Sequence, residues 1–102
     1  MIIYSVTVSI DVQIEADWVQ WMKEVHIPDV MATGLFLGQN MHRLIDPPPH
    51  TPGTATYNIQ YELASMPDYV NYQENHAAAL QEDHTSRYKD RFVAFRTILE
   101  RI

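Results

Sequence analysis

The sequence predicts one α+β domain of ferredoxin-like architecture, in which a four-stranded antiparallel sheet carries two helices on one face. Three observations predict it. Segments of strict period-two alternation stand near both ends and in the middle of the chain, two amphipathic helical segments separate them, and 102 residues suit a single domain. The resulting order β-α-β-β-α-β closes one sheet through two right-handed crossovers. We therefore treat residues 1–102 as one domain.

The first strand is expected over residues 2–10, where β-branched residues alternate in period two. The two alternating series are Ile2, Tyr4, Val6, Val8 and Ile10 on one side, and Ile3, Ser5, Thr7 and Ser9 on the other. The first helix follows from about Ile14 to Gly34, because apolar residues recur there at helical spacing. Pro28 interrupts this helix and removes the hydrogen bond to the Glu24 carbonyl. It either bends the helix beside a pocket or begins a second short helix after a plain break, and we favour the second interpretation.

The remaining elements complete the sheet. Residues 35–45 predict a second strand of weaker pattern, residues 46–53 (DPPPHTPG) a stiff exposed loop, and residues 54–63 a third, cleanly alternating strand. Ser65 begins the second helix as a capping residue whose hydroxyl accepts from the first turn, and this helix runs to about residue 88. The last strand is expected over residues 91–100.

Composition excludes several classes of function. The chain has no cysteine, which excludes disulfides, thiolate metal sites and a cysteine nucleophile. Seven Lys and Arg stand against 13 Asp and Glu, for a formal net charge of −6, which disfavours nucleic acid as a partner. No apolar run approaches membrane-spanning length, and the apolar N-terminus lacks the basic leader of a secretion signal. A cytoplasmic protein without a membrane partner is expected.

The sheet face away from the helices is predicted to bind a second copy of the chain. Its central side chains are short, polar and uncharged, and depletion of charge is typical of interface cores. Two sheets would then pack face to face about a two-fold axis, and a solvated face on a monomer is the alternative. The predicted interface residues are Ser5, Thr7, Ser9, Thr56, Asn58, Gln60 and Arg96. Arg96 is expected to pair with a carboxylate across the dimer, with an anionic ligand as its alternative partner.

Several segments resemble a small bacterial family, domain of unknown function 4286. They are MIIYSVTVSID, WVQWMKEVHIPDVMATGLF, TYNIQYE, the HAAALQEDH region and FVAFRTILE, which together cover nearly the whole chain apart from the proline-rich loop. The resemblance implies a ferredoxin-like fold of the dimeric α+β barrel kind. It implies no known activity and provides no catalytic residues.

A ligand site is expected between the helices and the covered face of the sheet, as is common in dimeric α+β barrels. The side chains that are candidates for this pocket are Trp18, Trp21, Met22, His26, Tyr57, Tyr61, Tyr69, Tyr72 and His76. His26 could serve as a general base near neutral pH, and the aromatic rings could hold a flat ligand. Taken singly, each of these residues is also typical of an ordinary hydrophobic core.

These observations predict a homodimer that binds a small organic ligand, and they leave open whether the protein is an enzyme. The alternatives are a cofactor-independent monooxygenase or isomerase, or an interaction module without a ligand. No cofactor or metal is expected: His76 and His84 lie about 12 Å apart along an unbroken helix, too far to share a metal ion. The first strand has no asparagine and both tryptophans lie on the first helix, so the pattern of haem-degrading enzymes on this fold is not matched.

Overall fold

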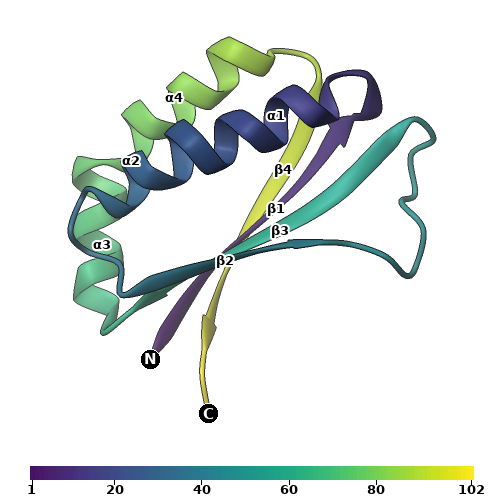
Figure 1. Cartoon of the computed structure of the whole chain (residues 1–102). Helices are drawn as coiled ribbons and strands as arrows, with labels where there is room; N and C mark the ends of the chain where they lie inside the picture. Colours follow the sequence, from purple (N-terminus) through teal and green to yellow (C-terminus); the bar gives the residue numbers. More distant parts are fainter.

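The computed structural model describes residues 1–102 and contains one four-stranded antiparallel sheet (Figure 1). The strands are β1 (Ile2–Asp11), β2 (Gly38–Arg43), β3 (Thr54–Leu63) and β4 (Phe92–Glu100). Their spatial order is β2-β3-β1-β4, so the first and third strands are central. The expected ferredoxin-like architecture is confirmed.

All helices lie on one face of this sheet (Figure 1). A short 3-10 turn (Val12–Ile14) leads into α1 (Glu15–Trp21), and α2 (Ile27–Met31), α3 (Met66–Asn75) and α4 (Ala77–Tyr88) follow. The first crossover contains α1 and α2, and the second contains α3 and α4. None of these helices has the length and apolar character needed to cross a membrane.

Pro28 is accommodated by a π-helical turn, Met22–His26, which joins α1 to α2 without a break. In this turn the Ile27 amide donates to the Met22 carbonyl, five residues back. A regular α-helix would press the ring of Pro28 against the Glu24 carbonyl, and the wider turn relaxes that constraint. Pro28 does lie in the first turn of α2, but the break that we favoured from the sequence is wrong: the helix is continuous (Figure 1).

The second helical region differs from its prediction at two points. It is divided at His76, whose φ of −131° and ψ of −36° lie outside the helical range, so that α3 and α4 replace the single helix expected. Ser65 occupies the N-cap position as expected, but its hydroxyl makes no capping bond. It lies 3.2 Å from Oδ2 of Asp68 instead.

The core lies between the helices and the alternating apolar series of β1 and β3. The strand register pairs Val6 with Ile59 and with Arg96, so these three side chains share the helix-covered face. Trp18 and Ile59 are completely buried in this layer. The assignment of Arg96 to the uncovered face is therefore wrong, because Arg96 lies opposite Val6 in the register of β1 and β4 and projects toward the helices.

The uncovered face has a polar centre beside an apolar edge. The six other residues predicted for this face, Ser5, Thr7, Ser9, Thr56, Asn58 and Gln60, pair with one another across β1 and β3.

Their side chains hydrogen-bond among themselves: the Asn58 amide donates to the hydroxyl oxygens of Ser5 and Thr7 at 2.9 and 3.0 Å. Along β4 the same face carries Val93 and Phe95, which are 73% and 60% exposed.

Candidate functional site

A small hollow lies where the sequence places a ligand site, between the helices and the covered face of the sheet. Its volume is about 30 Å³, which is room for roughly two water molecules. Its wall is formed by β1, β3 and β4, by the π-helical turn and by α2, α3 and α4. The lining residues are Tyr4, Val6, Met22, His26, Val30, Ile59, Tyr61, Tyr72, Gln81, His84 and Arg96.

Four of the nine candidate pocket residues line this hollow, namely Met22, His26, Tyr61 and Tyr72. The other five do not: Trp18, Trp21, Tyr57, Tyr69 and His76. Among these, Trp18 supports the site from behind through its contact with His84. The alternation of the first strand already placed Tyr4 and Val6 on the covered face, so the sequence held the signal for these two. His84 lies on the helical stripe that also carries Tyr72, so the sequence indicated its direction, whereas no pattern in the sequence indicated Gln81.

His84 is the most constrained polar group of the hollow. The indole Nε1 of Trp18 donates to Nε2 of His84 at 2.9 Å, and His84 is only 8% exposed. Burial, reinforced by the nearby rings of His26 and the Arg96 charge, lowers the pKa of His84 to about 4. At neutral pH the ring is therefore uncharged, and because Nε2 accepts, the proton must sit on Nδ1.

The Nδ1 proton of His84 has no acceptor within the protein. No polar side-chain atom that is fully shut off from solvent lacks a hydrogen-bond partner, so Nδ1 keeps contact with solvent, and His84 is one of the residues that line the hollow. His84 thus presents an N–H donor there, fixed in direction by the Trp18 bond on the opposite side of the ring.

His26 lies beside His84, with their ring centroids 5.8 Å apart. The indole of Trp21 stacks on the His26 ring at 5.1 Å and an interplanar angle of 27°. Burial lowers the pKa of His26, while the Asp29 and Asp83 carboxylates oppose that shift. The two imidazoles form one wall of the hollow, and both favour the neutral state over the imidazolium.

Three tyrosines form the opposite wall. Tyr4 packs against Tyr61 and Tyr72, with centroid distances of 5.9 and 5.5 Å, and all three side chains are almost completely buried. Burial raises the pKa of each hydroxyl, so all three stay protonated and can donate. For Tyr4, the neighbouring Arg96 charge and the Gln81 side chain partly offset the effect of burial.

Arg96 closes the hollow at the β4 edge and is its only exposed lining residue. The chain contains three ion pairs, which join Arg87 to Asp17, Arg91 to Asp11 and Arg101 to Glu62. Arg96 belongs to none of them. A cation without a carboxylate partner therefore stands at the mouth of a pocket whose interior is lined by aromatic rings.

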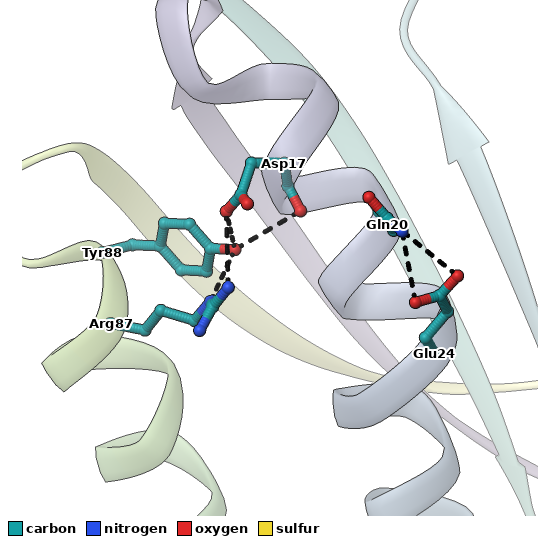
Figure 2. A network of polar contacts seen from close by, with 5 residues as sticks. All are labelled: Asp17, Gln20, Glu24, Arg87 and Tyr88. Carbon is teal, nitrogen blue, oxygen red and sulfur yellow. Dashed lines mark hydrogen bonds and ion pairs between the residues drawn. The ribbon is translucent and has the colours of Figure 1, made fainter.

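A polar clasp between α1 and α4 holds the helices that carry Trp18 and His84 (Figure 2). The Tyr88 hydroxyl donates to Oδ2 of Asp17 at 2.8 Å, and the Arg87 guanidinium reaches the same carboxylate at 3.7 Å. The clasp fixes the spacing of the two helices one turn away from the Trp18–His84 bond. Gln20 and Glu24, also drawn in Figure 2, interact only within the first helical region.

Replacing Tyr88 with phenylalanine is expected to lower the free energy of unfolding by about 1 kcal/mol, because one part-buried hydrogen bond to a carboxylate is lost. Gln20→Ala, which removes only an exposed contact of 3.4 Å, is the matched control and should change stability by less than about 0.5 kcal/mol. Urea unfolding followed by circular dichroism measures both. Equal stability of the two variants would contradict a stabilising role for the clasp.

A larger depression, about 570 Å³, lies at the other end of the sheet beside the loop between β2 and β3. Two of its three charged residues already satisfy each other: Arg91 pairs with Asp11 at 2.9 Å, and the Asp11 carboxylate also accepts from the Gln13 amide. It is bordered mainly by polar loop residues and is open to solvent. The smaller hollow is the better candidate site because its polar groups remain available. No group of three metal-ligating side chains gathers anywhere in the structure.

Comparison with solved structures shows the fold. HapK from Hahella chejuensis superposes with a TM-score of 0.73 at 13% identity, covering 100% of this chain and 93% of that one. A dimeric ferredoxin-like protein from an uncultured marine organism gives 0.70 at 11% identity, with 100% and 95% coverage. An ethyl tert-butyl ether d (ethd) family protein from Bacillus halodurans gives 0.67 at 10% identity and covers both chains completely.

No curated protein matches the chain by sequence. The family model described as Domain of unknown function (DUF4286), in contrast, matches residues 1–102, the whole length of the chain. The resemblance seen in the sequence segments is thereby confirmed, and the protein belongs to the DUF4286 family.

Proposed function

We propose that the protein is a homodimer that binds a small organic molecule in the hollow between its helices and its sheet. The observation that carries the binding function is the Nδ1–H of His84, a donor that has no acceptor in the protein, keeps contact with solvent and belongs to a residue that lines this hollow. A donor in such a confined place is satisfied only by water or by a ligand. Aromatic walls with a few convergent polar groups are typical of small-molecule sites.

The size of the hollow limits how a ligand enters. Sites for complete organic ligands usually measure roughly 300–1,000 Å³, whereas this hollow measures about 30 Å³. The hollow therefore takes a head group of a few atoms, while the rest of the ligand extends past Arg96. That side chain is exposed and unpaired, so its displacement breaks no ion pair.

The same small volume favours a second candidate function, a dimeric interaction module without a ligand. In that case water fills the hollow, and the aromatic residues serve only as core. Saturation-transfer NMR with benzoate, benzamide, phenol and benzylamine separates the two functions. Binding of at least one compound supports the ligand function, whereas no transfer to any of them at millimolar concentration supports the module.

A change that fills the hollow locates the binding. Val6→Ile adds one methylene group to a half-buried lining residue and should weaken binding of every compound that binds the parent protein. Val93→Ile adds the same group on the uncovered face, where Val93 is 73% exposed, and serves as the control. If both variants bind as the parent does, the ligand lies elsewhere.

The uncovered face supports the homodimer. Its central polar side chains already hydrogen-bond to one another, so burying them against a second sheet leaves few groups without partners. Val93, Phe95 and Leu99 add an exposed apolar strip along β4 on the same face. Two similar folds are described as dimeric ferredoxin-like proteins.

Light scattering after gel filtration tests the dimer. We expect a mass of about twice 11.9 kDa for the parent protein. Thr7→Lys places like charges near the centre of the face and should give monomers, because two unpaired ammonium groups would meet across the two-fold axis. Gln20→Lys on the exposed side of α1 should leave the dimer intact. A monomeric parent, or a Thr7→Lys variant that remains dimeric, overturns this arrangement.

A further inference from the structure

We infer that the ligand carries a compact anionic oxygen group, such as a carboxylate, which enters the hollow and binds Arg96. This inference rests on the ligand-binding function proposed above and specifies its substrate class. It follows from three features of the site: the sign of its charge, the predominance of hydrogen-bond donors in its wall, and its volume.

The charge of the site is positive even though the chain as a whole is acidic. The sequence contains 13 Asp and Glu, yet none of them lines the hollow. Arg96 is the one permanently charged lining residue, and none of the three ion pairs of the chain uses it. A guanidinium group matches a planar carboxylate through two parallel hydrogen bonds. An anionic ligand would thus supply the negatively charged partner that Arg96 lacks within the protein.

The hydrogen-bonding groups of the wall favour an acceptor. His84 offers Nδ1–H, since its Nε2 is occupied by the Trp18 indole. The hydroxyls of Tyr61 and Tyr72 make no hydrogen bond within the protein and are not sealed from solvent, so both can donate to a ligand in the hollow that these residues line. An ionised carboxylate accepts hydrogen bonds only, at both oxygens, and therefore complements donors on several sides. A cationic amine would instead face Arg96 and a row of donors, without a carboxylate among the lining residues.

The volume of the hollow suits a carboxylate group. Its volume of about 30 Å³ corresponds to roughly two water positions, which the two oxygens of a carboxylate can replace. The many aromatic rings among the lining residues suit an aromatic or aliphatic body attached to the carboxylate. Benzoate is the simplest probe with these properties, and benzamide is its uncharged analogue of the same shape.

The test compares dissociation constants for benzoate and benzamide by the fluorescence of Trp18 and Trp21, the two tryptophans of the chain, with NMR titration as confirmation. We expect benzoate to bind the parent at least about tenfold more tightly, the equivalent of roughly 1.4 kcal/mol. Arg96→Gln should remove this preference, so that benzoate and benzamide bind the variant with similar dissociation constants. Arg96→Lys keeps the charge but not the paired geometry, and should retain part of the preference.

Arg43→Gln is the matched control, because Arg43 also lies on an edge strand but packs over Tyr57 away from the hollow. It should behave as the parent does. If benzamide binds as tightly as benzoate, or if Arg96→Gln retains the preference, the anionic ligand is wrong while the binding function stands. If neither compound binds, the anionic ligand is wrong, and the binding function fails as well if phenol and benzylamine also show no saturation transfer. Circular dichroism verifies that each variant is folded.

Discussion

Replacing Trp18 with alanine is expected to lower the free energy of unfolding by about 3–5 kcal/mol, a large part of the stability of a domain of this size. Trp18 is completely buried, and its indole packs 5.0 Å from the ring of Tyr57. The substitution removes this packing, leaves a cavity between α1 and the sheet, and deprives Nε2 of His84 of its donor. Urea unfolding monitored by far-ultraviolet circular dichroism measures the loss.

Two further variants divide this effect into its parts. Trp18→Phe keeps most of the buried ring but removes the indole N–H, so it should cost about 1–3 kcal/mol through the unsatisfied Nε2 of His84. Trp21→Ala removes the same residue type one turn further along α1, where the side chain is only half-buried and covers His26. If Trp21→Ala is as destabilising as Trp18→Ala, the central position assigned to Trp18 is wrong.

The central elements of the fold could be predicted because each has a single dominant pattern. β1 and β3 alternate apolar and polar residues without exception over their inner parts. This alternation predicts both that each segment is a strand and that its apolar side chains face the helices. The observed β3 (Thr54–Leu63) coincides with the expected strand. The division of the second helix at His76 was not predictable in this way, because the apolar stripe continues through the break and local propensity there is only weakly unfavourable.

The site was harder to predict than the fold because β4 carries no clear alternation. One side of this strand presents Phe92, Ala94, Arg96 and Ile98, and the other presents Val93, Phe95, Thr97 and Leu99. Both series are mainly apolar, so the sequence does not show which one faces the helices, and Arg96 was assigned to the wrong face. Only the register with β1 resolves it.

The pairing of Trp18 with His84 illustrates a second limit. The two residues are 66 positions apart and lie on different helices, so their contact depends on how closely α1 and α4 approach. That distance is set by side-chain packing and by the Asp17–Tyr88 clasp, which no periodicity reveals. The pattern could place His84 on an apolar stripe, but it could not say that the ring would be buried, neutral and held by an indole.

The second large effect expected is a loss of stability on acidification. Burial lowers the pKa of His84 from 6.5 to about 4. Because the folded state disfavours the imidazolium, the stabilisation is fully present above pH 6.5, where His84 is neutral in both states. It is lost as the pH falls from 6.5 toward 4, because over this range His84 binds a proton in the unfolded state but remains largely neutral in the folded state. A shift of this size corresponds to a loss on the order of 3 kcal/mol.

The variant His84→Gln separates this contribution from the titration of carboxylates, which parent and variant share. Glutamine does not titrate, and its amide oxygen can still accept from the Trp18 indole. Between pH 7 and pH 4, the stability of His84→Gln in urea should therefore fall by about 3 kcal/mol less than that of the parent. His50→Gln, in the exposed loop before β3, is the control. Parallel curves for the parent and His84→Gln would mean that His84 is protonated as readily in the folded chain as in the unfolded one.

His26 reinforces the same dependence, since burial lowers its pKa as well. Its contribution is opposed by the Asp29 and Asp83 carboxylates, which favour the imidazolium and have no counterpart among the influences on His84. His26→Gln should therefore flatten the pH profile in the same direction as His84→Gln but by a smaller amount. The two effects should not add, because each imidazolium would repel the other across 5.8 Å, and removing one ring makes protonation of the second less costly.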